Sequence, residues 1–302
     1  MIKALYDVCA PAKLNLFLHV TGRRADGYHL IQSVFMLVDW CDTLHFELRP
    51  DGVITREDLS TVLPPDDLVL RAARALQAAG GVHAGTLQGA HIGVHKRIPA
   101  QAGMGGGSSD AATTLLALNR LWQLGLPLSK LTAIGLALGA DVPFFLFGNN
   151  AWVEGVGEKM SSVAVPPARF VVAKPPHGVE TAAIFSHPDL KRDTPNAIIS
   201  GFAQNPFAFG RNDLQSVAQA ACPGIEIGLS WLAKLDGVSA GQAGMRGQMT
   251  GSGSAVFAQV LGDLGPQETW LPAPDGFAVR LCSNMQMHPQ SGWAVADERR
   301  FA

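Results

Sequence analysis

The first fifty residues alternate between apolar and polar positions. Over 12–20 every second side chain is aliphatic or alanine, and Lys13 and Asn15 occupy intervening positions. A period of two is that of an extended strand with one buried face. Lys13 and Asn15 therefore project from the same face, within about 7 Å of each other. They either belong to a site or lie on an exposed strand edge. Further strands are predicted over 30–39 and, by alternation of its apolar residues, over 43–48.

A helical period replaces this alternation after residue 64. Two prolines and two aspartates precede an apolar stripe at positions 69, 72, 73 and 76, and two glycines follow it, which predicts a capped helix. A strand over 92–96, a long helix that ends at Leu124, and a helix from Ser129 to Gly139 come next. A strand over 151–156 completes the first half.

The second half continues this mixture after two prolines at 166–167, which predict a boundary between domains 1–165 and 166–302. The patterns predict strands over 169–174 and 255–260, helices that begin near 180, 214 and 225, and a loop with one short helix over 194–211. The glycine-rich turn over 249–254 could approach a phosphate through its backbone amides, but a plain hairpin connection is the expected role. Because strands and helices alternate irregularly, the predicted class is α+β.

A glycine-rich stretch joins the strand at 92–96 to the long helix. Its residues are Pro99, Ala100, Gln101, Ala102, Gly103, Met104, Gly105, Gly106, Gly107, Ser108 and Ser109. Glycines let the backbone approach a ligand closely, and the amides at a helix N-terminus bind anions. We expect Ser108, Ser109 or Asp110 to cap the helix. The stretch predicts a phosphate cradle, and the alternative is a loop that is merely flexible.

Two better-known phosphate motifs do not fit this stretch. The dinucleotide fingerprint needs a third glycine where Ser108 stands. The Walker A motif needs a lysine, and no lysine lies between Lys96 and Lys130. The loop therefore predicts a nucleotide site of another kind.

Two other places carry candidate chemistry. Asp141 is the only charged residue between Lys130 and Glu154, and a carboxylate in apolar surroundings needs a partner or a solvated cleft. It either bonds a helix end or acts in catalysis. A glycine turn presents Tyr28 and His29 side by side. The pair either packs the turn or stacks on and hydrogen-bonds a base.

Composition narrows the class of protein. The chain has 302 residues, of which 47% are hydrophobic and 16% charged, which suits two domains of about 150 residues. A net charge of -2 gives no basic surface for nucleic acid. No stretch resembles a signal peptide or a membrane span, so we expect a cytoplasmic protein without a membrane partner, as a monomer or weak homodimer. Four cysteines outside any CxxC pair are expected to be reduced thiols: Cys9, Cys41, Cys222 and Cys282.

The candidate residues together suit phosphoryl transfer. Such an enzyme needs a cradle for the donor phosphates, a cation near the transferred group, and a group that orients or deprotonates the acceptor hydroxyl. The glycine-rich loop, Lys13 and Asp141 are candidates for these three parts. A cation within about 4–6 Å of Asp141 would favour its carboxylate form. ATP with Mg²⁺ is the expected donor, and the hydroxyl of Ser108 or Ser109 is a candidate metal ligand.

Three motifs resemble those of one superfamily. Gly-Met-Gly-Gly-Gly-Ser-Ser-Asp-Ala-Ala at 103–112 is similar to the central ATP loop of the GHMP kinases. Pro-Ala-Lys-Leu-Asn at 11–15 is similar to their N-terminal motif, and Thr-Gly-Ser-Gly-Ser-Ala-Val-Phe at 250–257 to their C-terminal glycine motif. The resemblance implies an ATP-dependent kinase with a ribosomal-protein-like N-terminal domain, a ferredoxin-like C-terminal domain, and a site in the cleft between them.

Within this superfamily the match narrows to kinases whose acceptor carries a cytidine diphosphate. Arg-Ala-Asp-Gly-Tyr-His at 24–29 and Gly-Ala-Asp-Val-Pro-Phe-Phe at 139–145 carry this resemblance. It implies transfer of the ATP γ-phosphate to the 2-hydroxyl of a cytidine-diphospho sugar alcohol, in the non-mevalonate route to isoprenoids. The implied site residues are the catalytic pair Lys13 and Asp141, the cytidine contacts Tyr28, His29 and Phe185, and the acceptor-pocket residues Asn15 and Thr181.

One departure and three alternatives accompany this interpretation. Gln101-Ala102 replaces glycines that are common in the family loop, which predicts a stiffer entry to an intact cradle. The alternatives are another small-molecule GHMP kinase of mevalonate or homoserine type, an ATP-using lyase, and a non-catalytic nucleotide-binding protein. The Tyr28–His29 pair disfavours the first because mevalonate-type and homoserine-type sites have no cytosine to stack. The same loop and the placement of the acid within 139–145 disfavour the lyase. The presence of both Lys13 and Asp141 disfavours the third.

Overall fold

The computed structural model describes residues 2–80, 82–83, 86–235 and 247–297. The strands are β1 (Ala4–Arg23), β2 (His29–Arg49), β3 (Ile54–Asp58), β4 (Val82–His83), β5 (Thr86–Leu87), β6 (Gly89–His95), β7 (Ala151–Glu154), β8 (Lys159–Ser162), β9 (Arg169–Lys174), β10 (Gln248–Met249), β11 (Val256–Val260) and β12 (Ala278–Ser283). The helices are α1 (Leu68–Gly80), α2 (Gly106–Leu121), α3 (Leu128–Leu138), α4 (Val142–Phe147), α5 (Thr181–Ser186), α6 (Ile199–Gln204), α7 (Gln215–Ala221), α8 (Gly224–Leu232) and the 3-10 turn η1 (Gln267–Thr269).

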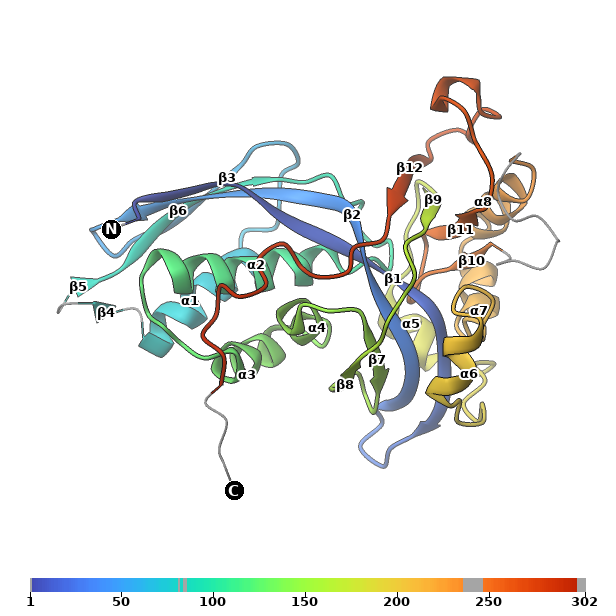
Figure 1. Cartoon of the computed structure of the whole chain (residues 1–302), viewed down its shortest axis with the longest axis horizontal. Helices are drawn as coiled ribbons and strands as arrows, with labels where there is room; N and C mark the ends of the chain where they lie inside the picture. The colour runs from blue at the N-terminus through green and yellow to red at the C-terminus, as the bar shows by residue number, and fades with distance from the viewer. Residues whose placement is uncertain (1, 81, 84–85, 236–246, 298–302) are drawn as a thin grey trace.

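The first half is a sheet with helices on one face. Its strands run in the order β3-β6-β2-β7-β8, and β1 pairs with β2. The helices α1 to α4 lie together beneath this sheet (Figure 1). Apolar side chains from α1, α2, β2 and β6 pack into one core between the two layers. The predicted stripe of α1 at 69, 72, 73 and 76 is buried in this core, and the Asp67 carboxylate accepts the Leu70 amide at 3.1 Å, so the predicted capped helix is confirmed.

The second half is a smaller sheet of order β10-β11-β9-β12, with α5 to α8 beside it (Figure 1). The predicted strands over 169–174 and 255–260 are confirmed as β9 and β11, and the 249–254 turn joins β10 to β11 as the predicted hairpin. The short helix expected within 194–211 is α6. The mixture of strands and helices in both halves confirms the α+β class.

Strand β1 differs from its prediction because both of its faces are buried. Leu14 and Leu16 pack in a cluster with Phe170 and Phe257 of the second sheet. Lys13, on the opposite face, is only 3% exposed. An alternating pattern predicts one buried face, whereas here the second sheet covers the leucine face, and residues of the first half, among them Phe35 and Asp141, cover the face that carries Lys13. The strand is thus the place where the two halves meet.

The cysteine prediction is wrong for one pair. Cys9 lies on β1 and Cys41 on the antiparallel β2, and their Cα atoms are 5.7 Å apart in a disulfide. The two residues are 32 positions apart in sequence, so local spacing could not reveal the pair. Cys222 and Cys282 are free and buried, as predicted.

The segment after β12 returns to the first half, which no sequence pattern indicated. The Met285 amide donates to the Leu37 carbonyl at 2.8 Å, and the His288 amide donates to the Gly148 carbonyl at 2.8 Å. Figure 1 shows this segment crossing α2 on its way to the C-terminus. Among the helices of the described ranges, none has the length and apolar character needed to cross a membrane.

Candidate active site

The glycine-rich loop is held from both halves of the chain. The Lys13 amide of β1 donates to the Met104 carbonyl at 3.0 Å. From the second half, the Ser254 amide donates to the Gln101 carbonyl at 3.1 Å. The loop therefore lies between β1 and the 249–254 turn, which places all three sequence motifs at one location.

Two glycines are required by the course of this loop. Gly103 and Gly105 have φ angles of 72° and 71°, in the left-handed region. A Cβ atom on Gly103 would lie 2.2 Å from the Thr250 carbonyl oxygen, and one on Gly105 would lie 3.0 Å from the Phe145 ring. Each glycine thus combines an unusual backbone angle with a close contact that excludes a side chain.

Helix α2 begins at Gly106, so the predicted cap is wrong. Gly105 is the N-cap residue and no side chain caps the helix. Ser109 and Asp110 are already in the first helical turns and are buried, and the Asp110 carboxylate bonds Lys96 instead of the leading amides. Those amides remain available to an anion at the positive end of the helix dipole.

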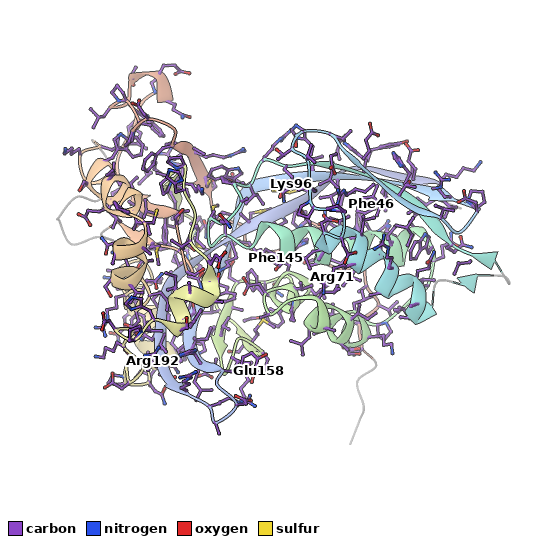
Figure 2. The ribbon with its side chains drawn as sticks, turned by 180° about the vertical axis from the view of Figure 1, so that it is seen from behind. Phe46, Arg71, Lys96, Phe145, Glu158 and Arg192 are labelled. Atoms are coloured by element: carbon purple, nitrogen blue, oxygen red, sulfur yellow. A yellow bond between two sulfur atoms is a disulfide. The ribbon has the colours of Figure 1, made fainter. Side chains whose placement is uncertain are left out.

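A buried ion cluster ties together the two ends of the loop. The Lys96 ammonium hydrogen-bonds both Asp42 and Asp110. Asp42 also accepts the Ile98 amide at 2.8 Å, where the loop begins, while Asp110 lies on α2, where it ends. Burial raises the pKa of Asp110 to about 7, although Lys96 opposes the shift. Lys96 is labelled in Figure 2, and its partners lie 54 and 14 positions away in sequence, so no local motif indicates the cluster.

Lys13 and Asp141 lie next to each other at the start of α2. The distance from Lys13 Nζ to the nearer Asp141 carboxylate oxygen is 3.8 Å. Lys13 Nζ also donates to Asn15 Oδ1 at 2.6 Å and lies 4.7 Å from the centroid of the Phe35 ring. Burial lowers the pKa of Lys13, and the Asp141 carboxylate opposes that shift. The buried Lys13 ammonium therefore has a carboxylate beside it, and its contacts with Asn15 and Phe35 hold the side chain in one orientation.

Asp141 occupies the position before α4, whose N-terminus its side chain does not cap. The alternative of a simple helix-end hydrogen bond is therefore wrong. Its side chain is 35% exposed, against 4% for Lys13. One member of the pair is thus open to a ligand while the other is held by the protein.

Asn15 and Thr181 both bond the C-terminal glycine turn. The Asn15 amide donates to Thr250 Oγ1 at 2.9 Å, and the hydroxyls of Thr181 and Ser252 are 2.7 Å apart. Thr181 begins α5 in the second half of the chain. The structure thus connects two predicted acceptor-pocket residues to the same turn that supports the glycine-rich loop.

His29 and Phe185 come together although they are far apart in sequence. Their ring centroids are 5.2 Å apart with an interplanar angle of 39°. Tyr28 is 65% exposed, and its ring contacts no other aromatic ring in the described part of the chain. Sequence reasoning missed Arg192, whose Nε atom donates to His29 Nε2 at 3.0 Å.

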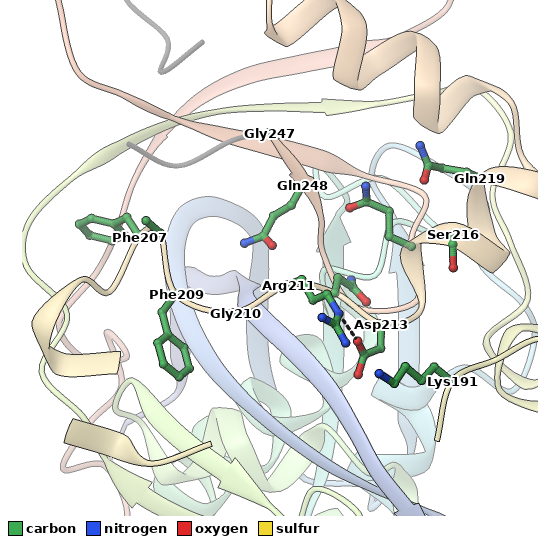
Figure 3. A pocket seen from close by; sticks show the side chains of 13 residues that line it. Lys191, Phe207, Phe209, Gly210, Arg211, Asp213, Ser216, Gln219, Gly247 and Gln248 are labelled. Carbon is green, nitrogen blue, oxygen red and sulfur yellow. Dashed lines mark hydrogen bonds and ion pairs between the residues drawn. The ribbon is translucent and has the colours of Figure 1, made fainter. Parts of the chain in front are cut away.

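A separate cavity of about 730 Å³ lies at the joint between β1 and the second half (Figure 3). None of the predicted site residues lines it. The buried Asp213 carboxylate accepts the Arg211 guanidinium at 2.7 Å and the Val20 amide at 2.9 Å. The Asn212 side chain donates to the Gly251 carbonyl at 2.8 Å. The Val20 bond joins β1 to the second half, and the Asn212 bond holds the glycine turn in place within that half.

Comparisons with known proteins identify the family. Residues 67–149 match the family described as GHMP kinases N terminal domain. A 4-diphosphocytidyl-2-C-methyl-D-erythritol kinase of Albidiferax ferrireducens is 65% identical over 296 residues, which cover 98% of each chain. The chain belongs to this kinase family. A relative of the same name from Variovorax paradoxus is 63% identical, over 97% of this chain and 100% of its own.

Solved structures agree with membership of the 4-diphosphocytidyl-2-C-methyl-D-erythritol kinase family. A crystal structure of 4-(cytidine 5'-diphospho)-2C-methyl-D-erythritol kinase superposes with a TM-score of 0.67 at 34% identity, covering 85% of this chain and 90% of its own. A homoserine kinase from Cytophaga hutchinsonii superposes with a TM-score of 0.68 at 14% identity, covering 95% and 97%. The second likeness shows the fold alone. The predicted superfamily and the two-domain GHMP kinase fold are thus confirmed, and ATP is the phosphate donor of such kinases.

Proposed function

We propose that this kinase transfers the γ-phosphate of ATP to the 2-hydroxyl of 4-diphosphocytidyl-2-C-methyl-D-erythritol. The observation that carries the proposal is the position of Lys13. Its backbone amide bonds the glycine-rich loop at Met104, and its ammonium lies 3.8 Å from the Asp141 carboxylate. One residue thereby links the expected phosphate cradle to the expected base.

The donor end of the site is the loop from Pro99 to Ser109. Uncapped amides at the start of α2 would hold the triphosphate, because they carry the positive end of the helix dipole. The contact between Gly103 and Thr250 keeps the loop closed against the C-terminal glycine turn. This arrangement favours binding of the donor phosphates in one orientation.

The protein also offers a hydroxyl ligand of the kind Mg²⁺ prefers. The Ser108 hydroxyl lies 3.7 Å from where a Cβ atom of Gly139 would be, beside the loop that carries Asp141. Ser109 is fully buried, so Ser108 is the better candidate of the two. Mg²⁺ held by Ser108 and by the phosphates would neutralise phosphate charge. Within the described ranges no set of three or more His, Cys, Asp or Glu residues is placed to hold a metal ion.

The chemical step uses Asp141 and Lys13. Asp141 accepts the proton of the acceptor hydroxyl as the hydroxyl oxygen attacks the γ-phosphorus. The bond from the γ-phosphorus to the bridging oxygen breaks, and ADP leaves. The Lys13 ammonium, which Asn15 holds at 2.6 Å, stabilises negative charge on the attacking oxygen and the transferred group.

The acceptor end is formed by residues of both halves, for which we propose the domain limits 1–165 and 166–302. Tyr28 and Phe185 would stack on the two faces of the cytosine, and His29 would bond its edge. Asn15 and Thr181 would contact the sugar alcohol. The exposed Tyr28 ring and the His29–Phe185 contact support this assignment.

The test is acceptor-dependent release of ADP. The protein is incubated with Mg-ATP and, separately, with the cytidine-diphospho acceptor, mevalonate or homoserine. We expect ADP to form with the first acceptor only. ADP formation with mevalonate or homoserine instead would assign the site to another small-molecule GHMP kinase.

A further inference from the structure

The Arg192 side chain bonds both the His29 ring and backbone carbonyls at the end of α5 and in the segment that follows it. Its Nη2 atom donates to the carbonyls of Phe185 at 3.1 Å and His187 at 2.7 Å, and its Nη1 atom donates to that of Leu190 at 2.9 Å. Its Nε atom is separate from these bonds and donates to His29 Nε2 at 3.0 Å. Figure 2 shows Arg192 in the second half, near the end of the molecule where β1 turns into β2.

The chemistry of the two side chains settles the proton on His29. A guanidinium group has donors only and remains charged in proteins. His29 Nε2 must therefore supply a lone pair, which excludes both the doubly protonated imidazolium and the tautomer with its proton on Nε2. The remaining form is neutral, with the proton on Nδ1. Burial, followed by the charges of Arg192 and Arg23, lowers the pKa of His29 and favours this neutral form.

We propose that Arg192 is a positioning residue that fixes His29 as the Nδ1–H tautomer and so sets the base specificity of the acceptor site. The carbonyl bonds of Arg192 hold its guanidinium in place, so the Nε–H is aimed at the ring in advance. In the described part of the chain no hydrogen bond uses His29 Nδ1. The Nδ1–H donor is therefore left for a ligand.

A fixed donor at this place distinguishes two pyrimidine bases. Cytosine has an acceptor at ring nitrogen N3, whereas uracil has an N–H donor there, so a donor on the protein pairs with the first and opposes the second. This inference rests on the proposed function, because it takes a cytidine group as the ligand. It adds the residue that would make His29 a donor in place of an acceptor.

The first test measures the tautomer without any substrate. Long-range proton–nitrogen NMR of the ¹⁵N-labelled full chain reports which ring nitrogen is protonated, and His29→Gln identifies the His29 signals. We expect Nδ1–H in the wild type and a shift toward Nε2–H in Arg192→Gln. A wild-type ring protonated on Nε2, or an unchanged tautomer in Arg192→Gln, would overturn the proposal. If Arg192→Gln does not fold, the wild-type spectrum still decides.

The second test measures specificity with acceptors that carry cytidine or uridine. We expect Arg192→Gln to raise the KM of the cytidine acceptor and to reduce the preference for it about 10-fold, with kcat and the KM of ATP nearly unchanged. Arg192→Lys, which restores a donor, should recover part of the preference. Lys191→Gln removes the neighbouring exposed cation and should change neither the KM of the cytidine acceptor nor the preference for it. An unchanged preference in Arg192→Gln would contradict the proposal. A wild type that phosphorylates neither acceptor would reject the proposed function while the NMR result stands.

Discussion

Lys13 shows how one residue connects the two ends of the site. Its backbone belongs to the strand that contacts the glycine-rich loop, and its ammonium faces Asn15 and Asp141. The sequence predicted that Lys13 and Asn15 share a face, and their 2.6 Å hydrogen bond confirms it. The closeness of Asp141 was implied only by family resemblance, because 128 positions of chain separate it from Lys13 and no local spacing relates them.

Replacing Asp141 by Asn tests whether this single residue is the general base. The substitution keeps the shape of the side chain but removes its ability to take a proton. We expect kcat to fall by at least about 10²-fold, a usual size for the loss of general-base help, with the Kd for ATP nearly unchanged. Steady-state kinetics and ATP titration measure the two quantities. Near-normal turnover would reject Asp141 as the base.

The two tyrosines of the chain provide a matched pair for the cytidine site. Tyr28 is 65% exposed beside His29, and Tyr6 is 60% exposed, with its hydroxyl bonded to Glu47. We expect Tyr28→Ala to raise the KM of the cytidine acceptor about 10-fold or more through loss of stacking, and to leave the KM of ATP alone. Tyr6→Ala should change neither. Equal increases for both substrates in Tyr28→Ala would show that the loop serves another purpose.

At the scale of elements, the glycine-rich loop depends on its contact with the hairpin between β10 and β11. Gly103→Ala would place a methyl group 2.2 Å from the Thr250 carbonyl at a φ of 72°. We expect the loop to move away from the hairpin and the KM of ATP to rise about 10-fold or more. Gly125→Ala is the control, because it has a similar φ of 62° but nothing within 4 Å of the new Cβ atom.

The comparison of these two variants separates loop position from backbone strain. Gly125→Ala should cost about 1 kcal/mol in the free energy of unfolding without changing the KM of ATP. Kinetics and denaturant titration of both variants give the two quantities. If Gly103→Ala changed stability alone, the contact with Thr250 would have no part in ATP binding.

Elements were predictable where their pattern depends on local periodicity. The buried stripe of α1 follows from a period of 3.6, and the strands β9 and β11 follow from short apolar runs next to proline or glycine turns. The start of α2 was misplaced because Ser108, Ser109 and Asp110 have capping side chains, while the structure uses Gly105 and buries Asp110 against Lys96. A local preference for capping was overridden by an ion cluster whose partners lie far apart in sequence.

At the scale of the whole molecule, the features that join the two halves were not predictable. The second buried face of β1, the Cys9–Cys41 disulfide and the return of 284–297 all depend on which segments meet in space. Sequence patterns indicate which side chains of a segment are buried, but not which other segment packs against them. Family resemblance supplied the arrangement of the halves because it carries the whole fold at once.

The buried cluster of Lys96 with two aspartates gives the stability of the whole chain a pH dependence. Burial raises the pKa of Asp110 to about 7, above its ordinary value of 3.8. The folded state then binds the proton more tightly than the unfolded state does, so this contribution is present below pH 3.8 and is lost as the pH rises through about 7. Asp110→Asn mimics the protonated carboxyl, so the variant should not lose this stability as the pH rises.

We therefore expect the free energy of unfolding of Asp110→Asn, relative to the wild type, to rise by about 1 kcal/mol or more between pH 5 and pH 8. Denaturant titration at several pH values measures this difference. Asp66→Asn is the control, because the side chain of Asp66 is 66% exposed. A difference that is flat or falls with pH would show that Asp110 is ionised throughout this range.

Phosphorylation at the 2-hydroxyl of the cytidine-diphospho methylerythritol acceptor can be told apart from reaction at its other hydroxyls. Carbon 2 of that acceptor carries a methyl group and the hydroxyl but no hydrogen, whereas its other hydroxyl-bearing carbons carry hydrogens. The most direct measurement is phosphorus NMR of a reaction with Mg-ATP, recorded with proton coupling. If the 2-hydroxyl is phosphorylated, one new monoester signal without splitting by an adjacent C–H forms in step with ADP. A split signal, or ADP without a new ester, would contradict transfer to the 2-hydroxyl.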